Sequence, residues 1–432
     1  MRKFIVIVVV VLVVLCGVGF YVYKTNNVNE TYENNEIKND SNMLSMMLET
    51  SAGSGEYQKT SASAWPTEGY VFNETLSKCE NGGTLSWDSI NKKVLMEGNS
   101  SDKCYVYFDI YKEPTIITDV CKSNDNLSNC IKNLYVSQGK NNLYLHDSTL
   151  ENSAGDNSYR YAGSSDTTNN FVCFGYDSQD GSCPTDNLYR IIGVFDGEVK
   201  LIKYDYAKST LLGTDGDYVQ TYKQAEGDSN WGFNKGQNSK SEIGAYYWNR
   251  NGTNTWSESQ LNTINLNKNY INKIDENGTK WSEKISDHTW KVGGNTWSNI
   301  GTQTAPTAYQ NEINKPATDK TVNAKVGLMY VSDYGYAASS SAWTTALGSY
   351  NNANVTANNW MYMGLYDWTL APRADSSYNA FYVYKYGDVR TNTVKNMSVY
   401  SGSAAARPVL YLKSTIGYGG GSGTAAKPIL VK

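Results

Sequence analysis

The sequence predicts an α+β, mainly β protein with an apolar segment near its amino terminus. Residues 4–23 (FIVIVVVVLVVLCGVGFYVY) form one unbroken apolar run, and short β-type segments separated by Gly- and Asn-rich turns fill much of the remaining chain. Tyr (35) and Trp (11) are plentiful among the 432 residues. Such alternating runs bounded by turn residues are typical of strands. We therefore expect a transmembrane helix, a small disulfide-stapled β-unit and a larger aromatic-rich domain.

The apolar run has the length of a membrane-spanning helix, because 20 helical residues cover roughly 30 Å, the thickness of a bilayer core. Arg2 and Lys3 precede it, and positive charge favours the cytoplasmic side. Residues 1–24 are thus predicted to be a membrane anchor, with the amino terminus inside and the carboxy-terminal ectodomain extracellular. The alternative is a cleaved signal peptide, which usually has a shorter apolar region ending in small residues. This run ends instead in Tyr21-Val22-Tyr23.

Composition argues against several classes of partner and site. The net charge of −4 gives a nucleic-acid partner no electrostatic support. The two histidines, His146 and His288, are too few for a three-His zinc site, and the chain has no H-E-x-x-H, P-loop or G-x-G-x-x-G motif. We expect no metal and no cofactor, and the sequence identifies no catalytic residue.

Six cysteines follow the apolar run and form three neighbouring pairs in the sequence: Cys79 with Cys104, Cys121 with Cys130, and Cys173 with Cys183. Six cysteines allow 15 pairings. Proximity along the chain favours these three local disulfides, and an extracellular location permits them.

The first third of the chain contains three predicted regions. Residues 25–65 are polar and typical of a stalk, with one short helix at Met43–Leu48. Residues 66–112 form the small β-unit, and residues 113–154 form a connector. Strands of the β-unit are expected at Tyr70–Phe72, Thr84–Trp87, Lys93–Met96 and Cys104–Asp109. The connector contains one helix, because apolar residues recur at helical spacing at Leu127, Cys130, Ile131, Leu134 and Tyr135.

Residues 155–432 are predicted to form the aromatic-rich α+β domain. Its clearest local signal is a β-hairpin over Tyr189–Tyr204, because Asp196-Gly197 suits a type I′ turn between two alternating strands. Phe171–Tyr176 is expected to be a neighbouring strand. Short helices should follow Trp256, with Ser257 and Ser282 as amino-terminal caps. Later strands are predicted at Val326–Val331, Trp360–Leu365, Phe381–Tyr386, Val394–Tyr400 and Pro408–Leu412, with an edge strand at Pro428–Val431.

The candidate ligand-binding residues are aromatic or arginine. Flat rings among amide and hydroxyl groups suit neutral ligands such as glycans, and the candidates of this type are Trp256, Trp281, Trp297, Trp360 and Trp368. The alternative is that most of these rings build the core. Arg373 and Arg407 are candidates for binding an anion, although the favoured interpretation is structural, with each guanidinium bonding several backbone carbonyls.

A pattern near the carboxy terminus supplies a family resemblance. Trp368, Leu370 and Arg373 form W-x-L-x-x-R, which Ala380, Val383 and Gly387 follow, and the pattern closes with Arg407-Pro-Val-Leu. Residues 155–432 thereby resemble uncharacterised surface proteins of low-GC Gram-positive gut bacteria that carry a carboxy-terminal domain of unknown function. The ending is distantly similar to C-type-lectin-like scaffolds, including Fibrobacter major paralogous domains. The calcium-sugar motifs of true C-type lectins are missing, so calcium-dependent sugar binding is not implied.

These observations predict a membrane-anchored extracellular binding or adhesion protein, whose ligand is a glycan or a surface protein. One alternative is a hydrolase that acts on glycans or the cell wall through paired carboxylates. Another alternative is a structural subunit of a surface array.

Overall fold

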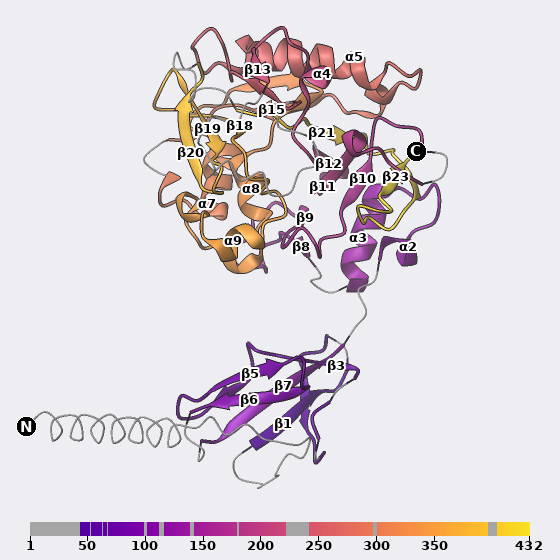
Figure 1. Cartoon of the computed structure of the whole chain (residues 1–432), viewed down its shortest axis with the longest axis vertical. Coiled ribbons are helices and arrows are strands. Elements are labelled where there is room, and N and C mark those ends of the chain that lie inside the picture. The colour runs from indigo at the N-terminus through magenta and orange to yellow at the C-terminus, as the bar shows by residue number, and fades with distance from the viewer. Residues whose placement is uncertain are drawn as a thin grey trace, which may run out of the picture. The chain divides into compact units, whose positions relative to one another are not determined.

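The computed structural model describes residues 44–432 except 52, 63, 67, 99–101, 112–115, 139–141, 179–180, 222–241, 297–299 and 396–403. It is mainly β with some helices, as predicted. The chain divides into two compact units, unit 1 (Met1–Pro114) and unit 2 (Thr115–Lys432) (Figure 1).

Unit 1 is a small β-unit with its own apolar core. Its sheet has the order β2-β1-β7-β3, β4 also pairs with β7, and β5 and β6 form a separate hairpin. The bounds are β1 Leu44–Glu49, β2 Tyr57–Lys59, β3 Tyr70–Phe72, β4 Lys78–Cys79, β5 Thr84–Asp88, β6 Lys93–Glu97 and β7 Cys104–Ile110. The four strands predicted in this region are confirmed. The core contains Leu44, Met46, Trp65, Val94, Met96, Cys104, Val106 and Phe108.

The helix predicted at Met43–Leu48 is wrong, because Leu44–Glu49 is strand β1 and pairs in parallel with β7. A short apolar run fits both periodicities, so its sequence does not distinguish helix from strand. The segment becomes a strand because it pairs with β7, some 60 residues further along the chain. Since Trp65 is also buried in this core, the later part of the predicted stalk (25–65) belongs to unit 1.

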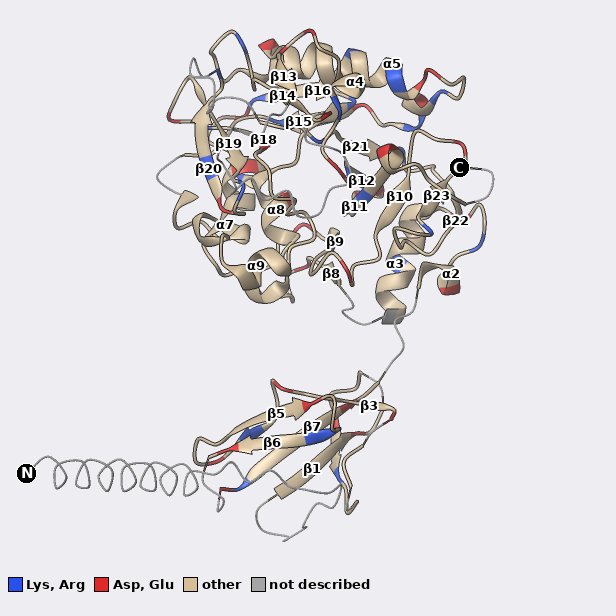
Figure 2. Cartoon of the chain, viewed as in Figure 1, with Lys and Arg blue, Asp and Glu red and all other residues tan. Residues whose placement is uncertain are grey.

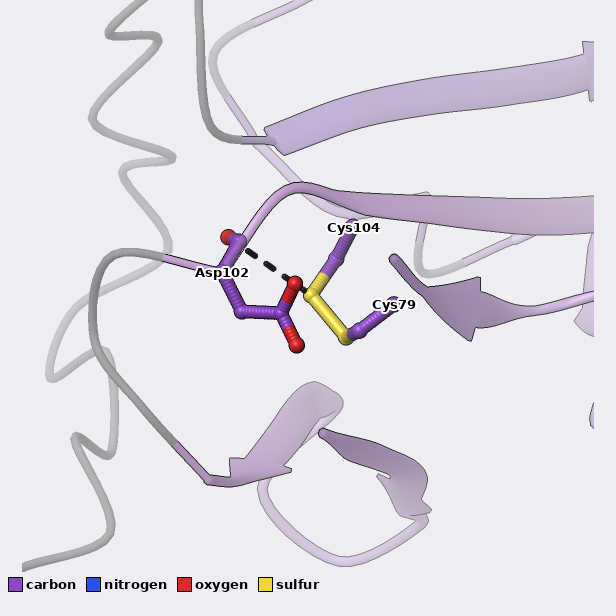
Figure 3. Close-up of side chains that lie close together, drawn as sticks. All are labelled: Cys79, Asp102 and Cys104. Carbon is purple, nitrogen blue, oxygen red and sulfur yellow. Dashed lines mark hydrogen bonds between the residues drawn. A yellow bond between two sulfur atoms is a disulfide. The ribbon is translucent and has the colours of Figure 1, made fainter. Parts of the chain in front are cut away.

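The three predicted disulfides are confirmed. Cys79 and Cys104 join β4 to β7 next to Asp102, as Figure 3 shows. The Asp102 carboxylate accepts the backbone N–H groups of Asn81 (2.8 Å) and Gly83 (3.0 Å). The disulfide and this carboxylate together fix the turn after β4.

Unit 2 is organised around one large sheet of order β17-β21-β12-β11-β10-β23-β22, with β9 pairing to β11 and β8 to β9. The bounds are β8 Leu143–Leu145, β9 Tyr159–Tyr161, β10 Phe171–Cys173, β11 Leu188–Phe195, β12 Glu198–Lys203, β17 Val326–Gly327, β21 Val409–Leu412, β22 Tyr418–Gly420 and β23 Ile429–Val431. The predicted edge strand at Pro428–Val431 is not at the edge, because β23 lies between β10 and β22.

The predicted hairpin is confirmed as β11 and β12. Asp196 (φ 49°) and Gly197 (φ 86°) both have positive φ, as a type I′ turn requires. A register shift between Ile191 and Gly193 lets β9 pair with the same strand. A Cβ atom on Gly193 would lie 2.2 Å from the Tyr159 carbonyl oxygen, so this close approach requires glycine.

Smaller sheets and short helices surround the large sheet of unit 2. The sheets pair β13 (Tyr218–Thr221) with β14 (Gly244–Tyr246), β15 (His288–Lys291) with β16 (Thr321–Ala324), and β18 (Asp367–Pro372) with β19 (Asn379–Val383) and β20 (Val389–Thr393). The α-helices are α2 Ile117–Val120, α3 Leu127–Gln138, α4 Ser209–Leu212, α5 Ile271–Ile274, α7 Ala305–Tyr309, α8 Val331–Tyr336 and α9 Ala353–Ala357. The other helical segments are η1 Thr185–Asn187, η2 Trp256–Glu258, η3 Leu261–Tyr270, η4 Trp281–Lys284, η5 Gln310–Asn314, η6 Ser340–Ala342 and η7 Leu347–Ser349.

The helix predicted in the connector is confirmed as α3, but residues 115–154 belong to unit 2. Leu127, Ile131 and Leu134 of α3 are buried in the core of unit 2, and α3 lies beside β8 and β9 (Figure 1). The segment therefore does not act as a separate connector.

Several predicted elements of unit 2 differ in the structure. Ser257 and Ser282 lie inside short 3₁₀ turns whose cap positions are Thr255 and Lys280. Val326–Val331 forms only a two-residue strand before α8. Trp360–Leu365 contains turns instead of a strand. β20 ends at Thr393, Val394 and Lys395 form a bend, and the rest of the predicted strand Val394–Tyr400 lies outside the described residues. Val326–Val331 and Trp360–Leu365 are short and buried, so packing outweighs local propensity there.

Across the part of the chain that the structure describes, no helix has the length and apolar character needed to cross a membrane. Residues 4–23, which carry the predicted anchor, lie outside that part.

We predict that replacing both Cys79 and Cys104 by Ala destabilises unit 1 and leaves unit 2 intact. Loss of a disulfide typically costs about 2–4 kcal/mol. Calorimetry of the full chain should show one transition shifted to lower temperature. The matched Cys121→Ala/Cys130→Ala variant should shift the other transition, and a common shift of both transitions by either variant would contradict the prediction.

We also predict that unit 2 loses stability below about pH 6.5 because His146 is buried and neutral. Burial, and then the nearby Arg160 cation, lower the pKa of His146 well below its usual value, while its Nδ1 accepts the Ala154 N–H (3.1 Å). The unfolded state therefore binds more protons once the pH falls below the unfolded pKa, and stability falls by up to about 1.4 kcal/mol per pH unit. The His146→Gln variant should show a shallower pH slope in denaturant titrations between about pH 6.5 and 4.5. An unchanged slope would contradict this assignment.

Candidate functional site

Four of the five candidate tryptophans are buried in unit 2. Trp256, Trp360 and Trp368 are each 1% exposed, and Trp281 is 4% exposed. The indole N–H groups of Trp360 and Trp368 donate to the backbone carbonyls of Tyr161 and Tyr246, each at 2.8 Å. These rings form the core, as the alternative interpretation held, and do not offer open faces to a ligand. Trp297 lies outside the described residues.

Arg407 has the structural role that the sequence favoured. It is 3% exposed, and its Nε donates to the Asp367 carboxylate at 2.7 Å. Its Nη2 donates to the Met361 carbonyl at 2.9 Å. Arg407 thus binds β18 to the turn that follows Trp360 and is buried away from ligands.

Arg373 has a different environment, at the edge of a cleft of about 770 Å³ in unit 2. We call this the hydroxyl cleft. Its lining residues are Thr253, Asn254, Thr255, Trp256, Ser257, Val292, Gly293, Thr318, Lys320, Thr321, Val322, Pro372, Arg373, Ala374, Asp375, Ser376 and Ser377. The structure therefore brings together two of the predicted site residues, Trp256 and Arg373, from segments more than 100 residues apart.

One wall of the hydroxyl cleft is the loop that joins β18 to β19. The Asn254 side-chain amide donates to the carbonyls of Arg373 (2.7 Å), Ser376 (2.7 Å) and Asn379 (3.0 Å). From the other side, the Ala374 N–H donates to the Asn295 carbonyl at 2.8 Å. The loop is thus held from two sides, so its side chains are oriented before any ligand arrives.

The opposite wall depends on a close approach between two backbones. A Cβ atom on Gly293 would lie 1.6 Å from the Thr318 carbonyl oxygen, so a larger residue does not fit. The Thr318 hydroxyl donates to the Gly293 carbonyl at 3.2 Å. This contact positions Thr318 and the following residues along the cleft.

The groups that line the hydroxyl cleft are hydroxyls and amides, together with apolar side chains and the charged Lys320, Arg373 and Asp375. They include one ion pair, in which Arg373 Nε and Nη2 bind the two Asp375 oxygens at 2.6 and 3.2 Å. Trp256 also lies at the wall of the cleft, but its side chain is buried, and its indole N–H is without a hydrogen-bond partner among the described residues. Hydroxyl groups both donate and accept hydrogen bonds, so this lining matches a ligand that is itself rich in hydroxyl or amide groups.

The hydroxyl cleft does not provide a pair of catalytic carboxylates. Among its described lining residues, Asp375 is the one acidic side chain, and Arg373 holds it. A second pocket, of about 270 Å³, contains Asp156, Asp196 and Asp333. Burial opposes ionisation of Asp156, but Arg160 and Ser158 outweigh it and lower the pKa to about 2. A glycosidase acid needs a raised pKa, so Asp156 does not fit that role.

Two groups of Cys and Asp side chains are close enough to share a metal: Cys79, Asp102 and Cys104, and Cys121, Asp125 and Cys130. Metal binding by cysteine requires the thiolate, whereas the cysteines of both groups form disulfides, and Figure 3 shows the one between Cys79 and Cys104. Each group therefore closes a loop of the chain through its disulfide.

No protein-family model, curated protein or solved structure matches the chain. The resemblance to Gram-positive surface proteins and to C-type-lectin-like scaffolds stays a prediction. Residue patterns missed Asn254, Asp375 and the neighbouring serines of the hydroxyl cleft. Asn254 directly follows an Asn-Gly-Thr segment (251–253) that recurs at 277–279, but nothing in that pattern indicated that the Asn254 amide would bind a distant loop.

We predict that Asn254→Ala loosens the loop formed by residues 373–377. The substitution leaves three backbone carbonyls without this donor, and lost hydrogen bonds of this kind typically cost about 1–3 kcal/mol. Amide hydrogen exchange should become faster in this loop. In the matched control, Asn358→Ala removes an exposed amide bonded to the Asn354 carbonyl and should leave the loop unchanged. Equal exchange in wild type and Asn254→Ala would contradict the positioning role.

Proposed function

We propose that this chain is a membrane-anchored extracellular binding or adhesion protein, and that the hydroxyl cleft binds a glycan, either free or on another surface protein. The observation that carries the proposal is the lining of the cleft, in which seven Thr and Ser hydroxyls and the Asn254 amide occur together with the Arg373–Asp375 pair and Lys320. Ligand sites of this size commonly combine apolar walls with a few fixed polar groups.

The distribution of charge favours a ligand that is neutral overall. In the ribbon view of Figure 2, Lys and Arg positions are interspersed with Asp and Glu positions along the described chain. In the cleft, Arg373 is paired with Asp375, and Lys320 is one further cation among the described lining residues, so the lining carries little net charge. The pair still supports sugar recognition, because a guanidinium donates and a carboxylate accepts hydrogen bonds from vicinal hydroxyls.

The extracellular location rests on two independent features. Three disulfides are typical of proteins that fold outside the reducing cytosol. The apolar run at residues 4–23, preceded by Arg2 and Lys3, has the length and flanking charge of a membrane anchor. Both features support display of unit 1 and unit 2 on the outer side of a membrane.

Binding fits the hydroxyl cleft better than hydrolysis does. Glycoside hydrolysis needs two carboxyl groups across the bond to be cleaved, whereas Asp375 is the one carboxylate among the described lining residues. Asp375 is also bonded by both donor atoms of Arg373. The site is therefore suited to hold a sugar and lacks the acid and base to cleave it.

We predict that Arg373→Ala weakens glycan binding about tenfold or more. Hydrogen bonds from a charged group contribute about 1.5–3 kcal/mol, and 1.4 kcal/mol corresponds to a factor of ten. The full-length chain in mild detergent is measured against mucin, peptidoglycan sacculi and a glycan array.

The matched control is Arg390→Ala. Arg390 forms the same kind of local pair, with Asp388, but does not line the cleft. Binding that survives in Arg390→Ala and is reduced in Arg373→Ala supports the site. Equal loss in both variants, or no binding by the wild type to any glycan, would contradict it.

A further inference from the structure

Lys200 and Asp333 form a buried pair within unit 2, away from the hydroxyl cleft. Lys200 lies on β12 and Asp333 on α8, and their side chains are 1% and 2% exposed. The distance from Lys200 Nζ to Asp333 Oδ2 is 2.6 Å. An amine and a carboxyl group held this close are within reach of covalent bond formation.

Aromatic rings surround the amine of Lys200. The Tyr330 ring centroid lies 4.7 Å from Nζ, and the centroids of Phe195 and Tyr411 both lie at 5.3 Å. This environment is largely apolar, although Lys200 and Asp333 also line the pocket of about 270 Å³. Burial lowers the pKa of Lys200, opposed by the attraction of Asp333, and so increases the share of the neutral amine, which is the nucleophilic form.

The carboxyl group of Asp333 accepts hydrogen bonds at Oδ2 and has a cation near Oδ1. The Tyr330 backbone N–H donates to Oδ2 at 2.9 Å, and Arg160 Nη1 lies 3.9 Å from Oδ1. Arg160 is itself fixed by Asp156 at 2.5 Å. These groups would stabilise the negative charge that develops on the carboxyl oxygens when an amine attacks the carbon.

Glu312 supplies a group that can carry a proton next to the pair. It is 2% exposed, its Oε1 accepts the Ser332 N–H at 2.6 Å, and its Oε2 is buried without a hydrogen-bond partner among the described residues. Burial raises the pKa of Glu312 to about 7. Near neutral pH this carboxyl can therefore both accept and release a proton.

We propose that Lys200 and Asp333 condense to an intramolecular amide bond and that Glu312 transfers the proton in this step. Lys200 passes a proton to the Asp333 carboxylate within the pair, and the resulting neutral amine attacks Cγ, so that a C–N bond forms. Glu312 takes a proton from the attacking nitrogen and gives it to the departing hydroxyl. The C–O bond then breaks, one water molecule leaves, and Glu312 returns to its initial state. No oxidant and no cofactor is needed.

The bond would link β12 in the large sheet to α8, 133 residues further along the chain. A covalent link between distant residues lowers the conformational entropy of the unfolded chain, as a disulfide does. Unlike a disulfide, an amide is not opened by reductants. This property suits a protein that links a membrane to a bound surface. The inference itself does not depend on the glycan-binding function.

The mass of the full-length chain tests the proposal directly. After complete reduction of the disulfides, the wild type should be lighter than its sequence mass by one water molecule. Protease digestion should yield a branched peptide that joins the segments around Lys200 and Asp333. An intact mass equal to the sequence mass, with the two segments recovered as separate peptides, would overturn the proposal without any variant.

Three variants assign the roles. Lys200→Arg should have the full sequence mass, whereas Lys291→Arg should keep the loss of one water, because Lys291 lines the same pocket but pairs with Asp319. Glu312→Gln should show at least a tenfold slower loss of water after synthesis. A water loss that persists in Lys200→Arg would overturn the bond, and an unchanged rate in Glu312→Gln would overturn the role of Glu312.

Discussion

Unit 2 depends on hydrogen bonds from buried indoles to backbone carbonyls. Trp248 donates to the Thr369 carbonyl, Trp290 to Ala324, Trp343 to Ala338, Trp360 to Tyr161 and Trp368 to Tyr246, at 2.8–3.0 Å. An indole fills a large volume and carries a donor that needs a partner when buried. Since most of these bonds join segments far apart in the chain, they hold together a fold whose smaller sheets have only two or three strands.

This use of tryptophan determines what is left for recognition. Because the rings point into the core, the surface loops carry Thr, Ser, Asn and a few charged residues. Where the loop after β18 meets residues 253–257, such polar and charged side chains line the hydroxyl cleft, and the buried Trp256 lies beside them. A core built from amphipathic rings therefore supports a polar site at the surface, which is held in place by its contacts with that core. Aromatic rings likewise surround the buried pair of Lys200 and Asp333.

The sequence predicted those features that depend on neighbouring residues. The Asp196-Gly197 hairpin, the strands of the β-unit, helix α3 and the three disulfides all follow from local turn chemistry, periodicity or short loops. Features set by distant contacts could not be predicted. β1 becomes a strand because β7 pairs with it, and Trp360 is buried because it bonds Tyr161, 199 residues earlier. Likewise, Arg373 was a candidate for binding an anion, and its partners Asn254 and Asp375 became visible only in the fold.

The central claim is that tryptophan forms the interior of unit 2 and leaves recognition to the loops. Hydroxyl-radical footprinting of the full-length chain, read residue by residue by mass spectrometry, tests it most directly. The account predicts strong protection of Trp248, Trp256, Trp290, Trp343, Trp360 and Trp368, with ready oxidation of Tyr378, which is 56% exposed and serves as an internal reference. Oxidation of these tryptophans at the rate of Tyr378 would contradict the account and restore the rings as a ligand surface.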